Sequence, residues 1–486
     1  MAWIAPGDAT GGVGGYGPVA PLWGWKRPGG GRAAHVTAGV EYQGTTVQVC
    51  GLYPYTAGSG SPLLGVPIGR HMLWGETVCL DPIAWLRAGL VTNPGVFLLG
   101  QPGTGKSALA HRLITGMVAT GTRALVLGDT KPDYTPHITA LDGQVITVGR
   151  GRDRINPLDA GPLGQALARM SGAEAAALRW EVRGRRLALL LALATLVRGA
   201  AVSNAEEVIL GRAMDLLGER PGPTPTVPDV LALLAEGPDE LRAAARAENP
   251  ADYTARVDGL LFTLSLLCEG SLAGVFDGPT STPIDLDAPA VSIDISHVGV
   301  AGDTLLAAAL LCVWSYGFGM IDASATLAQA GLGPRRTHLA VMDELWRALR
   351  GPGLVAYADA LTRLNRALGM GSLMITHSLA DLDALTSAED RAQAQGFIDR
   401  AAITIAAGLP PRELDRLDQI TPMTSGERDM VASWSAPESW QPGTRHPGRG
   451  KYLLKTAGRL GIPVQMTLVG AEYDLYDSDQ AIRAAR

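Results

Sequence analysis

The chain has 486 residues, 47% of them hydrophobic and 18% charged, and carries a net charge of −6 at pH 7. This length and composition predict a globular protein of two or three domains and exclude a disordered chain. The acidic balance provides no general basic surface, so any contact with nucleic acid must be local, for instance in the pore of an assembly.

The cysteines Cys50, Cys79, Cys268 and Cys312 lie far apart and form no C-x-x-C pair. No secretory signal precedes them. This pattern predicts a reducing, cytoplasmic location and no zinc site.

The first 60 residues are rich in glycine and proline, and predict a flexible N-terminal arm without a core of its own. From residue 61 onward, short apolar runs alternate with helical segments, which predicts an α/β fold with a mostly parallel sheet and helices on both faces. The strands that we expect are 96–100, 124–129, 144–149, 291–296, 338–344, 372–377 and 401–408. Two later runs, KYLLKT from 451 and PVQMTLV from 463, predict a hairpin at the edge of the sheet.

The stretch 158–285 follows helical periodicity throughout, and SNAEE from 203 and TPTVPDV from 224 have the features of helix starts. We therefore expect an all-helical insertion at 158–285 that divides the α/β core into 61–157 and 286–486.

One uncharged apolar segment, 304–321, approaches the roughly 20 residues that a membrane-spanning helix needs. Two glycines near its end, the lack of a basic flank and its place between two predicted strands favour a buried core helix instead. We expect no membrane span in this chain.

The segment GQPGTGKS at 100–107 has the spacing of a phosphate-binding loop (Walker A), and it lies between a predicted strand and a predicted helix. Glycines let such a loop wrap phosphates with its backbone N–H groups, while Lys106 reaches the β and γ phosphates and Ser107 holds Mg²⁺. The predicted cofactors are ATP and Mg²⁺, and the predicted binding residues are Gly100, Gln101, Pro102, Gly103, Thr104, Gly105, Lys106, Ser107 and Ala108.

The run LAVMDELW at 339–346 is an apolar strand that ends in two adjacent acids, as a Walker B segment does. Asp343 would bind the Mg²⁺ shell and Glu344 would polarise the attacking water. Adjacent acids also occur at ordinary solvated strand ends. In a chain that carries a phosphate-binding loop, however, the catalytic interpretation is favoured.

A further strand, within SLMITHSLADL at 372–382, ends in polar residues at the same sheet edge, where Thr376 or His377 could sense the γ phosphate. The alternative for His377 is a hydrogen-bonded loop histidine. Before this strand, Arg363 and Arg366 are either exposed surface residues or an arginine finger that reaches the nucleotide of a neighbouring subunit.

The order of these segments, with DTKPDY at 129–134 and INPLD at 155–159, resembles the conjugative-transfer ATPases of type IV secretion. These are the VirB-four or TraC class of the HerA and FtsK superfamily, and the resemblance covers about residues 62–480. Matching positions include GVPIG from 65, LDP from 80, and the residues Asp129, Lys131, Tyr134, Asn156 and Pro157. His377 stands where the family usually has glutamine, and the family's large N-terminal domain is replaced by about 60 glycine-rich residues.

The resemblance implies RecA-like subunits in a homo-oligomeric ring, expected to be a hexamer, with ATP at the subunit interfaces and Arg366 acting in trans. A phosphate-binding loop alone would also allow a monomeric kinase. The implied catalytic residues are Lys106, Glu344, Arg366 and His377, and the implied metal ligands are Ser107 and Asp343.

The leading functional hypothesis is an ATP-hydrolysing motor at the inner face of the cell membrane, which energises transfer of DNA or protein through a secretion or conjugation complex. The alternative is a cytoplasmic DNA translocase or DNA-processing ATPase of the HerA and FtsK kind, and a nucleotide-bound scaffold is a third, non-enzymatic hypothesis. A VirD-four-type coupling protein is disfavoured because the N-terminus lacks membrane helices. Direct DNA contact could come from the arginines of RWEVRGRRLALL at 179–190, although such a helix is more often a solvated face.

Overall fold

The computed structural model describes residues 61–220, 222–269, 272–298, 302–344, 355, 368–380, 388–435, 446–456 and 458–476. The predicted N-terminal arm therefore lies outside the described residues, as do Arg363 and Arg366.

The described strands form one sheet in the order β2-β1-β11-β10-β9-β3-β8-β7-β4-β6-β5. The seven strands from β9 to β5 are parallel, and the four at the other end pair antiparallel. The strands are β1 Val66–His71, β2 Thr77–Leu80, β3 Gly95–Leu99, β4 Arg123–Asp129, β5 Gln144–Thr147, β6 Ala290–Asp294, β7 His338–Met342, β8 Met370–Thr376, β9 Ile403–Ala406, β10 Lys451–Lys455 and β11 Ile462–Gln465. This confirms the predicted α/β fold with a mostly parallel sheet.

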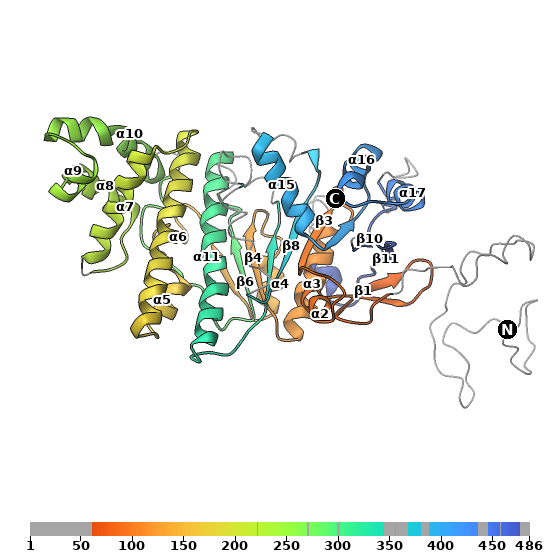
Figure 1. Ribbon diagram of the computed structural model, residues 1–486. Helices are drawn as coiled ribbons and strands as arrows, with labels where there is room; N and C mark the ends of the chain where they lie inside the picture. Colours follow the sequence, from red (N-terminus) through yellow and green to blue (C-terminus); the bar gives the residue numbers. More distant parts are fainter. Residues whose placement is uncertain are drawn as a thin grey trace, which may run out of the picture.

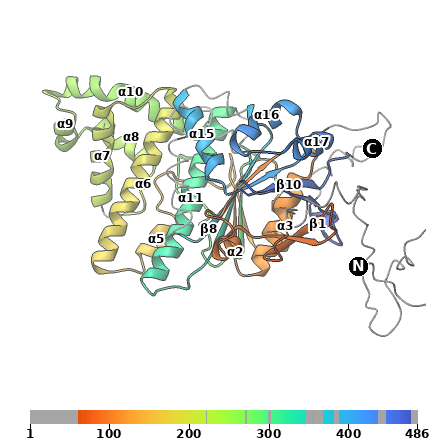
Figure 2. The ribbon, with the colours of Figure 1, turned by 45° about the vertical axis from the view of Figure 1, so that its right-hand side comes forward.

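Helices cover both faces of the sheet, and the side chains of the strands pack into two cores, one on each face. Alternate residues of β3 face opposite sides, so that Phe97 and Leu99 join one core while Val96 and Leu98 join the other. The helices are α2 Pro82–Arg87, α3 Lys106–Ala119, α4 Thr135–Ala140, α5 Pro162–Leu167, α6 Gly172–Arg198, α7 Asn204–Glu219, α8 Val227–Glu236, α9 Asp239–Ala244, α10 Pro250–Cys268, α11 Asp303–Gln329, α15 Ala388–Arg400, α16 Pro411–Ile420, α17 Ser425–Ser433 and α18 Glu472–Leu475. Figures 1 and 2 show α7–α10 at one end of the molecule and α16 and α17 at the other.

In the described part of the chain between β5 and β6, all regular elements are helices, α5–α10. Both predicted helix starts are confirmed. Ser203 caps α7 and Thr226 caps α8, each through a capping box with the acid three residues later.

The hydrophobic helix α11 lies between the sheet and the helices α5 and α6 (Figure 1). Among the described residues it is the one helix long and apolar enough to cross a membrane, but 89% of its apolar window is buried inside the protein. The Trp314 indole donates a hydrogen bond to the carbonyl oxygen of Leu127 on β4. This burial is what the predicted core helix requires.

The predicted hairpin of β10 and β11 forms, but its predicted position at the edge of the sheet is wrong. β1 pairs with β11, and β2 pairs with β1 on the outside. Gly69 lets β1 approach β11 closely, since a Cβ at this position would lie 2.4 Å from the Gln465 carbonyl oxygen. The glycines and prolines in this stretch interrupt the alternation by which a strand is predicted.

Candidate nucleotide-binding and catalytic site

The loop between β3 and α3 has the backbone shape that a phosphate-binding loop needs. Gly103 and Gly105 adopt φ angles of 80° and 96°, a region that favours glycine. Gly105 is also the N-cap of α3, so the helix begins at Lys106 with its positive end toward the loop. The Thr104 hydroxyl donates to the Gln101 carbonyl oxygen at 2.7 Å and tightens the turn.

Residues far away in the sequence brace this loop. The Tyr452 hydroxyl on β10 donates to the Gly105 carbonyl oxygen at 2.6 Å, and the Gly450 amide donates to the Thr104 carbonyl oxygen at 2.9 Å. On the other side, the Gln101 amide donates to the Gly408 carbonyl oxygen at 3.1 Å. These contacts were not predictable from the sequence, because no local pattern links positions more than 300 residues apart.

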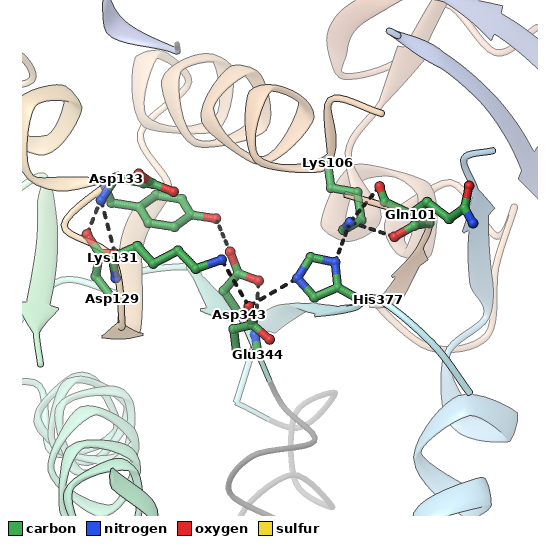
Figure 3. Close-up of polar contacts among 10 residues, drawn as sticks. Gln101, Lys106, Asp129, Lys131, Asp133, Asp343, Glu344 and His377 are labelled. Atoms are coloured by element: carbon green, nitrogen blue, oxygen red, sulfur yellow. Dashed lines mark hydrogen bonds and ion pairs between the residues drawn. The ribbon is translucent and has the colours of Figure 1, made fainter. Parts of the chain in front are cut away.

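Lys106 is 6% exposed and is folded back onto its own loop (Figure 3). Its ammonium donates to the carbonyl oxygens of Gly100 at 2.6 Å and Gln101 at 3.1 Å, and it lies 2.8 Å from Nδ1 of His377. Burial lowers the pKa of Lys106 to about 8, although the charges of Asp343 and Glu344 oppose this shift. A negatively charged ligand here would restore the proton affinity of the amine.

The two acids predicted to form a Walker B segment, Asp343 and Glu344, follow β7 directly. Asp343 accepts hydrogen bonds from the Tyr134 hydroxyl at 3.1 Å and from the backbone amide of Glu344 at 2.9 Å. Burial raises the pKa of Asp343, and the neighbouring charge of Glu344 raises it further. Oxygen ligands of this kind suit Mg²⁺, and a bound cation would offset the charge of the two adjacent acids, so these residues fit the expected metal.

Glu344 is held in an unusual conformation for a non-glycine residue, with φ at 55°. It is 5% exposed, and its Oε1 lies 3.0 Å from Nε2 of His377 and 3.5 Å from the Lys131 ammonium. The backbone therefore turns this carboxylate toward the edge of the sheet that carries Lys106.

His377 bridges the lysine of the loop and the second acid (Figure 3). An ammonium has only donors, so Nδ1 of His377 accepts from Lys106 and the ring hydrogen on Nε2 is donated to Glu344. A neutral imidazole with its hydrogen on Nε2 fits both contacts. His377 follows Thr376, which ends β8 and is 2% exposed.

The structure thus brings Lys106, Asp343, Glu344 and His377 together. Parallel pairing aligns Leu99 with Thr376 and Met342 with Met374, which places the loops after β3, β7 and β8 at one edge of the sheet. Ser107 is the second residue of α3 and is partly exposed at the same edge.

The sequence analysis assigned no role to a further loop, 129–134 after β4, which also lies at this edge. The Asp129 carboxylate accepts from the backbone amides of Lys131, Asp133 and Tyr134 at 2.8–3.3 Å. Burial raises the pKa of Asp129 to about 6, against the effect of these amides. The resemblance of DTKPDY to a family segment marks Asp129, Lys131 and Tyr134 as matching positions, without a role for any of them.

Most arginines of the cluster on α6 form ion pairs or are partly buried within the protein. Arg183 forms an ion pair with Asp215 on α7, and Arg185 pairs with Asp322 on α11 and with Glu181. Arg186 lies partly buried beside the cavity between α5, α6 and α11. These contacts explain the cluster by packing, and weaken its interpretation as a DNA-binding face.

No known family model and no curated protein matches the sequence. The structure is similar to VirB4 of Thermoanaerobacter pseudethanolicus, with a TM-score of 0.63 and 20% identity over 86% of this chain and 99% of that chain. It is also similar to the bacterial conjugative coupling protein TrwB in its unbound form, with a TM-score of 0.50 and 12% identity over 87% of this chain and 92% of that one. For TrwB in complex with a non-hydrolysable ATP analogue, the TM-score is 0.50 and the identity is 13%, over 85% of this chain and 97% of that chain.

At these identities the comparisons establish the fold. The chain has the fold of the VirB4 and TrwB P-loop ATPases, which confirms the RecA-like architecture and the resemblance to the VirB-four class.

Proposed function

We propose that this chain is a Mg²⁺-dependent ATPase motor of the conjugation or type IV secretion kind, which energises the transfer of a DNA or protein substrate across the cell envelope. The observation that carries the proposal is the convergence of Lys106, Asp343, Glu344 and His377, from three strand ends, in one hydrogen-bonded network. The fold shared with the solved VirB4 chain, 99% of which is covered, supports the same proposal.

The contacts suggest how the residues act on ATP. Lys106 exchanges the carbonyl oxygens of Gly100 and Gln101 for the β and γ phosphates, and the amides of the loop surround these phosphates. Bound Mg²⁺, held by Ser107 and Asp343, would neutralise charge on the phosphate oxygens. Glu344 orients and polarises the attacking water, since phosphoryl transfer depends mainly on positioning and charge stabilisation.

His377 is proposed to act as the γ-phosphate sensor. Its two ring nitrogens contact Lys106 and Glu344, so a γ phosphate that attracts Lys106 also frees one side of the imidazole. Arg366, which lies outside the described residues, is proposed to act on the nucleotide of the next subunit in a hexameric ring. Docking of that ring to a membrane secretion or conjugation complex is part of the proposal.

The alternative within the same fold is a DNA translocase or DNA-processing ATPase in the cytoplasm. The similarity to the coupling protein TrwB is the reason to retain this alternative, whereas the ion pairs of the α6 arginines weaken the case for the DNA-binding face considered for it.

The mass in solution and the DNA dependence of ATP hydrolysis discriminate between these functions. The purified full chain would be studied by light scattering with and without Mg²⁺-ATP, and its hydrolysis rate measured with and without single- and double-stranded DNA. A nucleotide-dependent hexamer whose hydrolysis is indifferent to DNA supports the secretion motor, and stimulation by DNA supports the translocase. A chain that stays monomeric with Mg²⁺-ATP, and whose hydrolysis rate does not depend on assembly, would contradict the proposed ring.

A further inference from the structure

The loop 129–134 contacts both Walker B acids, although it follows a different strand from them. Tyr134 donates to Asp343, and Lys131 lies beside Glu344 (Figure 3). The loop is fixed from within, because Asp129 is 2% exposed and accepts three of its backbone amides. These hydrogen bonds within the loop hold its shape.

Tyr134 is built into the protein as a hydrogen-bond donor. It is 1% exposed, its ring centroid lies 4.6 Å from that of His111 on α3, and its backbone amide donates to Asp129 at 2.8 Å. The Tyr134 hydroxyl donates to Asp343 at 3.1 Å. Asp343 has one oxygen held by this hydroxyl and the other by the Glu344 amide.

Lys131 differs from Tyr134 in its exposure. Its side chain is 62% exposed, whereas the side chain of its partner Glu344 is 6% exposed. The Glu344 carboxylate thus lies between a cation on the β4 loop and the imidazole of His377 on the β8 loop. Because Glu344 has a strained backbone, contacts to its side chain have a large influence on where the carboxylate points.

We propose that the loop 129–134 is a positioning element of the active site, in which Lys131 orients the carboxylate of Glu344 and Tyr134 orients the carboxylate of Asp343. This inference rests on the proposed ATPase function and assigns the two residues to different steps. Lys131 acts on the polarisation of water, and Tyr134 acts on the binding of Mg²⁺.

Steady-state ATP hydrolysis by four variants tests the two assignments. Lys131→Met is expected to lower kcat about 10-fold or more with KM within about 2-fold of wild type, and Lys131→Arg to recover most of the loss. Tyr134→Phe is expected to raise the Mg²⁺ concentration for half-maximal activity about 3-fold or more, since second-shell partners tune metal affinity. Arg87→Met is the matched control, since it also replaces an exposed cation by methionine. Arg87 ends α2, which packs near the start of β8, and its substitution is expected to leave the kinetics unchanged.

Two kinetic results would overturn the inference. One is a wild-type kcat, or a faster one, in Lys131→Met. The other is an equal loss in Lys131→Met and Lys131→Arg, which would indicate a structural effect of any substitution in the loop.

A double-mutant cycle in urea unfolding separates the failure of this inference from the failure of the proposed function. Lys131→Met, Glu344→Gln and the double variant are compared with wild type, and contacting residues are expected to give non-additive shifts of the midpoint. Non-additive shifts in a protein without ATPase activity would retain the Lys131–Glu344 coupling and reject the function. Additive shifts in an active protein would reject the positioning role of Lys131.

Discussion

At the scale of single residues, the surroundings of Lys106 decide the protonation of its amine. Its ammonium contacts two carbonyl oxygens and one imidazole nitrogen, all of them neutral acceptors. Burial therefore lowers its pKa to about 8. Phosphate oxygens would favour the charged form, so binding of ATP and protonation of Lys106 are linked.

This linkage predicts that ATP binds more weakly as the pH rises through 8. Where Lys106 is neutral, binding of ATP requires that the amine takes up a proton, so the dissociation constant is expected to rise roughly 30-fold between pH 7 and pH 9.5. Titration calorimetry at pH 8.5 in buffers of different ionisation enthalpy would measure the uptake directly, with pH 7 as the control. An affinity that is flat across this range, with no proton uptake at pH 8.5, would contradict the low pKa.

The residues proposed to be catalytic were recognisable in the sequence because each stands at the end of an apolar run. Lys106 lies in a motif of fixed spacing, and Glu344 and His377 follow strands whose parallel pairing places their ends at one edge. Lys131 and Tyr452 received no role because their contacts join segments 213 and 347 residues apart. Such contacts depend on the order of strands in the sheet, which local patterns do not encode.

At the scale of elements, the central strands of the sheet are buried on both faces. Burial of a polar side chain on such a strand lowers the stability of the fold unless the side chain has a hydrogen-bond partner. His338 begins β7 and is 1% exposed, and neither ring nitrogen has a hydrogen-bond partner among the described groups. Burial lowers the pKa of His338 to about 4, and the nearby charges of Arg336 and Arg123 act in the same direction.

Substitution of His338 by leucine is therefore expected to make the protein less sensitive to acid. In the unfolded chain a histidine takes up a proton below about pH 6.5, whereas folded His338 stays neutral down to about pH 4, so its contribution to stability is lost as the pH falls between these values. Between pH 7.5 and pH 5 the free energy of unfolding of wild type should fall by about 2 kcal/mol more than that of His338→Leu. Urea unfolding of both proteins at the two pH values measures this difference. Equal losses would show that His338 is not held neutral.

The antiparallel end of the sheet is the element that the sequence analysis placed incorrectly. β10 and β11 were recognisable as a hairpin, but β1 contains Pro67 and Gly69 and does not read as a strand. Its position is fixed by tertiary contacts, among them the close approach of Gly69 to Gln465 and the packing of Val66 against Gly116 of α3. This end of the sheet also carries Tyr452, so it supports the phosphate-binding loop directly.

At the scale of the whole molecule, the sheet separates two cores, and the proposed nucleotide site lies at the edge where its parallel strands end. The alternation of apolar and helical segments was enough to predict this architecture, and the capping boxes of Ser203 and Thr226 predicted helix starts within α7–α10. The ion pairs that join α6 to α7 and α11 were not predictable, since the partners of an arginine depend on how helices pack.

Lys106, Asp343, Glu344 and His377 are proposed to form an ATP-hydrolysing site in which Glu344 polarises the attacking water. The most direct test is Glu344→Gln, with Mg²⁺-ATP binding measured by calorimetry and hydrolysis followed in a single turnover. We predict a dissociation constant within about 3-fold of wild type and a hydrolysis rate lower by about 100-fold or more. A variant that hydrolyses ATP at the wild-type rate, or a wild-type chain that binds no ATP, would contradict the claim.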